Sequence, residues 1–352
     1  MSEAGKTQED PALVLPDYGG GSLVNLMSSI ATALGGTSAY PPLATLPPQA
    51  LAGARHLVLL VVDGLGLDYL SSRDGALRRH LHGQLTSVFP STTASAIPTF
   101  LTGLAPQQHG LTGWNMYFRE IGAIAAPLPF RVRTGRHALR EAGVTPATLF
   151  GLMPLFDRLP LSCHVVSPRN IVHSDFNVAL SGRAQRHGYD TLDELFGLIA
   201  GLLRNDAPSY IHAYWPQLDS LAHEYGIRSE QVATAFTALD AAFEGLLDVV
   251  AGSGSRLIVT PTTASSTARR SRPSIWTTIP PCATPCCFRY AASPAWPTLT
   301  FALAGKGYSR TMCGSSWPTA SSYSAAQISC SAAGWARARR IPACATVSAT
   351  TS

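Results

Sequence analysis

The hydrophobic and polar positions of residues 51–260 predict strands that alternate with helices. His56 to Val62 is a continuous apolar run of strand length, which is typical of a strand buried on both faces of a parallel sheet. Shorter strands are predicted at Tyr210 to Trp215 and at Arg256 to Thr260. Between them, Ser229 to Val250 has apolar residues at helical spacing, which predicts the crossover helix of a parallel connection. The pattern indicates an α/β fold with a mostly parallel central sheet.

The same pattern suggests how the chain is divided. Residues 1–50 precede the first predicted strand and are interpreted as an N-terminal extension. Residues 51–260 form the predicted core, in which about residues 115–205 are richer in Pro and Arg and are interpreted as an irregular insertion or lid. Residues 261–352 are interpreted as an aberrant, disordered tail.

Composition changes abruptly after Thr260. Residues 1–260 contain all 21 acidic residues and 17 of the 26 basic ones, so their net charge is −4. The remaining residues contain nine Lys or Arg, no Asp or Glu, and six of the seven cysteines. Low-complexity composition of this kind is typical of a genuine disordered tail, or else the reading frame has changed.

The genetic code favours a change of frame. From Thr260 to Ser265, the third base of each codon can be read with the first two bases of the next codon, and this shift permits the string Ala-Asp-His-Gly. The same shift restores acids and ordinary strand and helix composition over the rest of the tail. We therefore interpret the tail as a frameshift, and the sheet as incomplete at the C-terminus.

The charge and cysteine content exclude several classes of protein. The sequence pI of about 8.9 comes from the tail alone, so we expect no nucleic-acid partner. The N-terminus lacks the basic start of a signal peptide, and no apolar run has the length of a membrane span, so we expect a cytoplasmic protein with no membrane partner. Cys163 is the single cysteine of the core, which fits a reducing compartment, and the spacing of Cys282, Cys286 and Cys287 matches no common zinc site.

Three groups of residues can carry chemistry. Asp63 ends the first predicted strand, where a carboxylate is either a metal ligand or part of a turn. Thr93 lies in a hydroxyl-rich segment before a predicted helix, and such hydroxyls either cap the helix or attack a phosphoryl group. Asp219 and His223 are four residues apart on one helical face, where they either bind one ion in common or form a surface contact.

Taken together, three motifs resemble the type I phosphodiesterase and nucleotide pyrophosphatase family of the alkaline phosphatase superfamily. The motifs are VDGLG at Asp63, FPSTTASAIPTFLTGLAPQQHG around Thr93, and WPQLDSLAHEYG around Asp219. The resemblance implies an alkaline-phosphatase-like α/β/α sandwich with two divalent metal ions, expected to be Zn²⁺, and a small-molecule phosphate ester or nucleotide as substrate. It implies that Asp63 and Thr93 bind one ion, that Thr93 attacks phosphorus, and that Asp219 and His223 bind the other ion.

The chain departs from the family pattern in two respects. Ala96 stands where many relatives have an asparagine that holds a phosphoryl oxygen. The family also places an Asp-His pair on the next strand, and here that pair appears only in the shifted frame. Each ion is therefore left with about two protein ligands, whereas catalytic zinc normally keeps three. We expect the chain as printed to be poorly stable and nearly inactive.

Other assignments remain open. Thr92 is the neighbouring alternative to Thr93 as nucleophile, Ser91 is a weaker one, and His109 is expected to be structural. A sulfatase is excluded because its nucleophile motif is absent. A phosphoglycerate mutase, a phosphonoacetate hydrolase or a phosphomonoesterase would share the metal pattern. A non-enzymatic binding protein, or a catalytically dead remnant, would retain the same four residues without bound metal. The sequence does not determine the oligomeric state.

Overall fold

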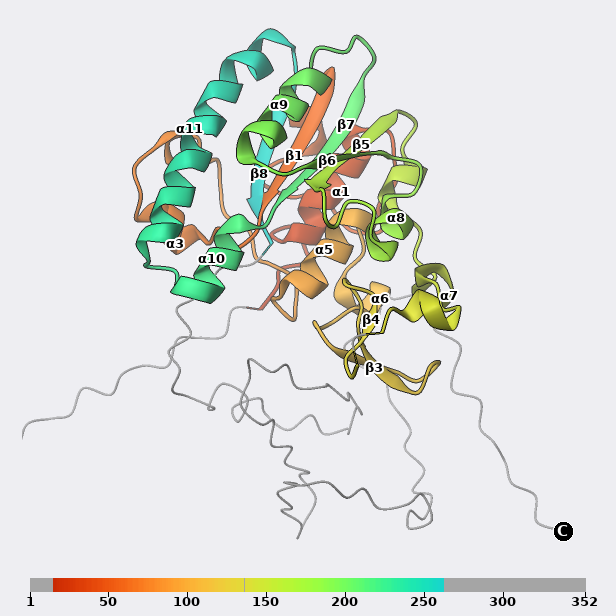
Figure 1. Ribbon diagram of the computed structural model, residues 1–352. Helices are drawn as coiled ribbons and strands as arrows, with labels where there is room; N and C mark the ends of the chain where they lie inside the picture. The colour runs from red at the N-terminus through yellow and green to blue at the C-terminus, as the bar shows by residue number, and fades with distance from the viewer. Residues whose placement is uncertain (1–14, 136, 263–352) are drawn as a thin grey trace, which may run out of the picture. The chain divides into compact units, whose positions relative to one another are not determined.

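The computed structural model describes residues 15–135 and 137–262, and a parallel sheet lies at its centre (Figure 1). The strands are β1 (His56–Val62), β5 (Ser162–Pro168), β6 (Gln185–Tyr189), β7 (Ser209–Trp215) and β8 (Arg256–Pro261). Their order across the sheet is β6-β5-β7-β1-β8, and each neighbouring pair is parallel. The mostly parallel sheet expected from the sequence is confirmed.

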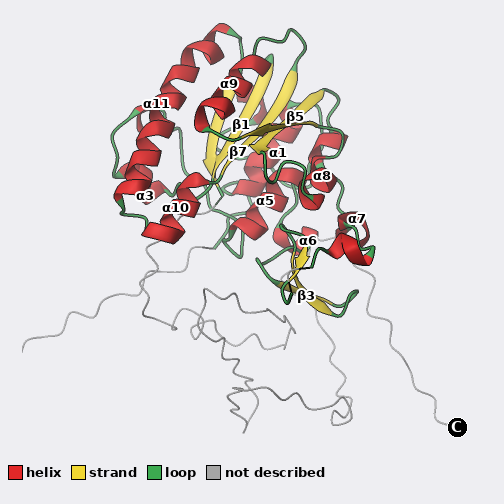
Figure 2. Cartoon of the chain, viewed as in Figure 1, coloured by secondary structure: helices red, strands yellow, loops and turns green. Residues whose placement is uncertain are grey.

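The side chains of β1 alternate between two hydrophobic layers, because successive residues of a strand point to opposite faces. Leu57, Leu59 and Val61 pack with residues of α1 (Leu23–Ala33) and α5 (Thr93–Thr102). Val58, Leu60 and Val62 pack with residues of α9 (Leu192–Leu202) and α11 (Glu230–Gly252). The sheet is thus covered by helices on both faces, in an α/β/α arrangement (Figure 2).

Short elements connect these layers. A second, antiparallel sheet has the order β2-β3-β4 and consists of β2 (Met116–Phe118), β3 (Ala123–Ala126) and β4 (Arg131–Val132). The remaining helices are α2 (Pro48–Leu51), α3 (Leu67–Ser71), α4 (Ala76–Arg79), α6 (Pro106–His109), α7 (Pro146–Phe150), α8 (Asp175–Ser181) and α10 (Gln217–Tyr225), with 3₁₀ turns η1 (Leu139–Ala142) and η2 (Leu155–Arg158). Among the described helices, none is both long and apolar enough to cross a membrane.

The region predicted as an irregular insertion, residues 115–205, differs from that prediction in its second half. It supplies β5, β6 and α9 to the central sheet and its cover. These strands lack a long apolar run because His164 and Ser167 interrupt β5, and because β6, with the sequence QRHGY, lies at an edge of the sheet. Edge strands carry polar residues on positions that face solvent. Only the first half, with the small sheet, matches the expected irregularity.

The predicted N-terminal extension also contributes to the core. Residues 23–31, the first nine of α1, are all buried, and several of them pack against the same layer as Leu57 and Leu59. A helix whose residues are buried on all sides is part of the core of a fold and is not an extension that precedes it. The predicted core therefore begins before residue 51. The predicted tail begins two residues too early, because Pro261 belongs to β8 and Thr262 is buried. The rest of that prediction, residues 263–352 with the cysteines at 282, 286 and 287, lies outside the described residues.

A buried histidine of β7 predicts acid sensitivity. His212 packs against the rings of Phe100 and Phe156, and burial lowers its pKa from 6.5 to about 4. Between these two pH values the unfolded chain binds a proton that the folded chain does not, so stability falls as pH falls from 6.5 towards 4. The loss for this one group is up to about 3 kcal/mol.

We therefore expect the urea midpoint to drop between pH 7 and pH 4.5, and to drop less in His212→Leu. His173→Leu is the matched control, since it makes the same substitution at an exposed histidine. The same pH dependence in wild type and in His212→Leu would contradict this assignment.

Candidate active site

The register of the sheet brings three residues level at its carboxyl edge. Val62 of β1 is aligned with Trp215 of β7 and with Pro261 of β8. The next residue of each strand, namely Asp63, Pro216 and Thr262, therefore lies at the same edge. Ligands bind in parallel α/β sheets at this edge. The location predicted from the strand ends is confirmed for Asp63.

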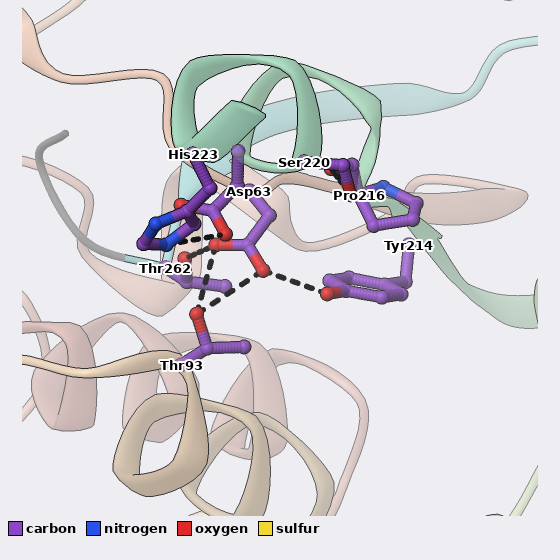
Figure 3. Close-up of polar contacts among 8 residues, drawn as sticks. Asp63, Thr93, Tyr214, Pro216, Ser220, His223 and Thr262 are labelled. Carbon is purple, nitrogen blue, oxygen red and sulfur yellow. Dashed lines mark hydrogen bonds and ion pairs between the residues drawn. The ribbon is translucent and has the colours of Figure 1, made fainter. Parts of the chain in front are cut away.

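Asp63 is a buried carboxylate surrounded by hydroxyl groups. Its side chain is 2% exposed. The hydroxyl of Thr93 donates to it, at 3.1 Å from Oδ1 and 3.2 Å from Oδ2, and the Tyr214 hydroxyl donates to Oδ2 at 2.7 Å (Figure 3). Thr262 at the end of β8 donates its hydroxyl to Oδ1. Three hydroxyls from three separate elements thus converge on one carboxylate.

This environment fits a cation. No Lys, Arg or His among the described residues forms an ion pair with Asp63. A buried carboxylate is normally paired with a positive charge or bound to a metal ion, and Asp63 has no such ion pair among the described residues. However, residues 15–135 and 137–262 contain no group of three or more His, Cys, Asp or Glu side chains placed to hold a metal ion. The residues present therefore fit a metal site only in part.

Thr93 is the first residue of α5, and its hydroxyl points at the Asp63 carboxylate (Figure 3). The N-cap is Thr92, which makes no side-chain capping hydrogen bond. Capping therefore does not account for the Thr93 hydroxyl, which is bonded to Asp63 instead. Thr93 is half-buried, so its oxygen lies at the boundary between the core and the edge of the sheet. A helix N-terminus at this point also favours a bound anion.

Asp219 and His223 lie four residues apart on α10, as the sequence predicts. His223 Nε2 is 3.4 Å from Asp219 Oδ2, and the two side chains are 79% and 24% exposed. A partly exposed pair of this kind contributes little to stability by itself. Burial raises the pKa of Tyr214, and the charges of Asp63 and then Asp219 raise it further. The negative charge of Asp219 therefore contributes to the raised pKa of the Tyr214 phenol.

His109 and Ala96 have structural environments. His109 Nε2 is 3.2 Å from both Thr99 Oγ1 and the Ser95 carbonyl, while Nδ1 accepts a hydrogen bond from the Leu111 amide. Burial lowers the pKa of His109 to about 4, so the ring is neutral near pH 7. These contacts agree with the predicted structural role. Ala96 is fully buried and packs in the hydrophobic layer with α1.

Two residues at the site were not predicted from the sequence, namely Tyr214 and Thr262. Both follow from strand register. Tyr214 is aligned with Val61 and lies on the same face of β7 as Tyr210 and His212, so polar groups recur at every second residue of this strand. Thr262 follows β8 in the same way as Asp63 follows β1. The alternation and the position after the strand were the available signals.

Comparison with solved structures finds chains of low sequence identity. One is murine ectonucleotide pyrophosphatase/phosphodiesterase 5, an inactive variant in complex with AMP, at 15% identity and a TM-score of 0.44, with 58% of this chain and 56% of that chain covered. Another is phosphonoacetate hydrolase from Sinorhizobium meliloti 1021 in complex with phosphonoformate, at 19% identity and a TM-score of 0.38, with 60% and 57% covered. The matched part thus spans little more than half the length of these structures. No curated protein matches the sequence.

The sequence itself gives the stronger comparison. The model of the family described as type I phosphodiesterase/nucleotide pyrophosphatase matches residues 57–260, which is more than half of the 352 residues. This range contains Asp63, Thr93, Asp219 and His223, and it begins and ends within β1 and β8. The resemblance inferred from the three motifs is confirmed, and the chain belongs to the type I phosphodiesterase/nucleotide pyrophosphatase family.

Proposed function

We propose that this chain derives from a metal-dependent hydrolase of phosphodiester or nucleotide pyrophosphate bonds, with Thr93 as the nucleophile. The observation that carries the proposal is the contact between the Thr93 hydroxyl and the buried Asp63 carboxylate, at 3.1 Å from Oδ1. An alcohol at the start of a helix and a carboxylate beside it are the groups needed to bind one cation and to aim one oxygen at phosphorus. The substrate is proposed to be a small-molecule phosphate ester or nucleotide.

The proposed cofactors are two divalent metal ions. Asp63 and Thr93 supply oxygen ligands for one, and Asp219 and His223 supply an oxygen and a nitrogen ligand for the other. Zn²⁺ is the proposed metal because it accepts this mixture of carboxylate and imidazole. Each pair falls one ligand short of the three that catalytic zinc normally keeps.

The residues suggest a two-step displacement. Asp63 accepts the hydrogen bond of Thr93 and so fixes the direction of its oxygen, while the first turn of α5 offers backbone N–H groups to a phosphoryl oxygen. When bound, divalent ions lower the pKa of a hydroxyl and neutralise charge on phosphate oxygens. The Thr93 hydroxyl gives up its proton to solvent, and its oxygen forms a bond to phosphorus as the bond to the leaving oxygen breaks and that oxygen takes up a proton. Water then attacks phosphorus, which releases the phosphate product and returns a proton to the Thr93 oxygen.

We also propose that the missing ligands were lost through a frameshift after Thr260. Two observations support this proposal. The family match ends at residue 260, at the boundary where composition changes. If one base is missing after the codon of Thr260, the permitted string Ala-Asp-His-Gly begins at residue 261 and places its Asp at position 262. The side chain at that position already contacts Asp63. A carboxylate there would lie beside Asp63 and share its cation.

Sequencing the coding DNA across Arg256 to Arg270 tests the frameshift directly. A one-base correction there is the expected result. An unchanged base sequence would show that the chain is a true relative that has lost ligands, and would favour the second candidate function, a catalytically dead remnant or binding protein. The lack of a three-ligand cluster within the described residues is the observation that favours that candidate.

Metal removal tests the chemistry in the frame-restored protein. We expect hydrolysis of bis(p-nitrophenyl) phosphate to stop on treatment with a chelator and to return with Zn²⁺, because both the nucleophile and the phosphoryl oxygens depend on the ions. The monoester p-nitrophenyl phosphate and phosphonoacetate, assayed in parallel, separate this activity from a phosphomonoesterase and a phosphonate hydrolase. Hydrolysis that persists at full rate after chelation and dialysis would contradict the proposal.

We propose that the protein is located in the cytoplasm. Its support is the buried free thiol of Cys163, the single cysteine within residues 15–262. Burial raises the pKa of this thiol to about 11, so it is a protonated, unreactive group.

A further inference from the structure

We propose that Tyr214 is a positioning residue that sets the orientation of the Asp63 carboxylate for metal binding. This inference rests on the proposed function. It begins from the 2.7 Å hydrogen bond that the Tyr214 hydroxyl donates to Asp63 Oδ2, which is shorter than either contact of Thr93 with this carboxylate. The phenol comes from the neighbouring strand, so it acts on Asp63 across the sheet.

The three hydroxyls contact different oxygens of the Asp63 carboxylate. Tyr214 donates to Oδ2 alone, Thr262 donates to Oδ1 alone, and Thr93 lies within hydrogen-bond distance of both. The terminal torsion of an Asp side chain has only a broad preference, so its orientation depends on its partners. Thr93 is the proposed nucleophile, and Thr262 occupies the position proposed for a lost ligand. Tyr214 is the remaining hydroxyl partner of the carboxylate, and the only hydrogen bond of its hydroxyl among the described residues is the one to Asp63.

Tyr214 is itself held firmly. It is aligned with Val61 in the parallel pairing of β7 with β1. Its carbonyl accepts a 2.8 Å hydrogen bond from the hydroxyl of Tyr189, at the end of β6. The backbone of Tyr214 is therefore fixed by the sheet and by Tyr189, and its hydroxyl contacts the Asp63 carboxylate (Figure 3). Partners that fix a ligand in this way typically change metal affinity by about 10- to 100-fold when they are removed.

The chain provides a matched control at Tyr210. This residue lies on the same strand and face as Tyr214, is fully buried, and has a hydroxyl without a hydrogen-bond partner in the described part of the chain. Tyr210→Phe removes the same atom as Tyr214→Phe but removes no contact with Asp63. A general effect of losing a buried phenol oxygen would therefore appear in both variants.

The test is the dissociation constant of Zn²⁺ for the full chain as printed, measured by competition with a chromophoric chelator. We expect Tyr214→Phe to raise this constant by about 10-fold or more, and Tyr210→Phe to change it less than about twofold. Circular dichroism establishes that each variant is folded. Tyr189→Phe is a second test of the same inference, because it removes the hydrogen bond to the Tyr214 carbonyl and should weaken Zn²⁺ binding by a smaller factor.

The outcomes separate the two proposals. Wild-type affinity in a folded Tyr214→Phe variant overturns the role of Tyr214 and leaves the proposed function standing. An equal loss of affinity in Tyr210→Phe also overturns it, because the effect would then be a general one of the strand. If Tyr214→Phe does not fold, unchanged affinity in Tyr189→Phe overturns it. A wild-type chain that binds no Zn²⁺ overturns this inference, while activity of the frame-restored protein decides the proposed function separately.

Discussion

Restoring the reading frame after Thr260 is expected to raise the rate of Zn²⁺-dependent phosphodiester hydrolysis by at least about 10³-fold, since metal ions supply several kcal/mol of transition-state stabilisation and 1.36 kcal/mol corresponds to a factor of ten. The physical reason is the number of ligands. The printed chain offers two for each proposed ion, and the shifted frame adds an Asp and a His. The measurement is kcat/KM for bis(p-nitrophenyl) phosphate with both purified proteins in the presence of Zn²⁺.

A single substitution separates the effect of the ligand from the effect of the tail. Thr262→Asp in the printed chain places a second carboxylate beside Asp63, where the threonine hydroxyl now donates to Oδ1. It should tighten Zn²⁺ binding, whereas the uncharged and similarly shaped Thr262→Asn should not. Equal rates for the printed and frame-restored proteins would contradict the proposed loss of ligands, as would a Thr262→Asp variant with unchanged affinity.

Thr93→Ala in the frame-restored protein is expected to lower kcat by at least about 10³-fold, because removal of a covalent nucleophile leaves only binding and electrostatic stabilisation. The hydroxyl that it removes is the one directed at Asp63. The affinity for Zn²⁺ should fall much less, because Asp63 and the two ligands proposed on α10 remain. The measurement combines kcat at saturating substrate with a Zn²⁺ titration.

Thr92→Ala is the matched control for this experiment. Thr92 is the N-cap of α5 but makes no side-chain capping hydrogen bond, so its removal should change kcat by less than about tenfold, or 1.4 kcal/mol. A larger loss in Thr92→Ala than in Thr93→Ala would identify Thr92 as the nucleophile. Comparable small losses of kcat in both variants would contradict the proposal that a threonine is the nucleophile.

The strands that could be predicted are those with continuous apolar runs. β1 matches its predicted bounds, and the predictions of β7, β8 and α11 differ from the structure by no more than two residues at either end. β1 and β7 are buried on both faces and α11 buries one stripe, whereas β8 is only partly buried but contains three consecutive apolar residues, so hydrophobicity indicates the position of all four elements. β5 and β6 were missed because histidines and polar residues occupy them. For α9, the hydroxyl of Thr191 accepts a hydrogen bond from the Glu194 amide, and the spacing of these two residues is a capping signal that the apolar pattern did not use.

The candidate site could be predicted only where a motif carried it. Asp63 and Thr93 come together as the resemblance implied, and Asp219 and His223 share one face of α10. Their binding of metal remains a proposal. For Tyr214 and Thr262 the local sequence offered only weak signals, namely the alternation along β7 and the position after β8, because a tyrosine in a strand and a threonine after one are common features. Their contacts with Asp63 depend on how three strands far apart in the chain align, and a local pattern does not contain that alignment.

Because the contacts of Asp63 depend on how the strands align, the length of each strand matters for the site as much as its residue types do. Because side chains alternate faces with a period of two, inserting or deleting one residue in β8 would turn Thr262 away from Asp63 while leaving the composition almost unchanged. Exchanging one apolar residue for another would preserve the contact. The same reasoning distinguishes errors in the gene by position. A lost base before Arg256 would abolish β8 altogether, whereas a lost base after Thr260 leaves this strand paired with β1 and removes only what should follow it.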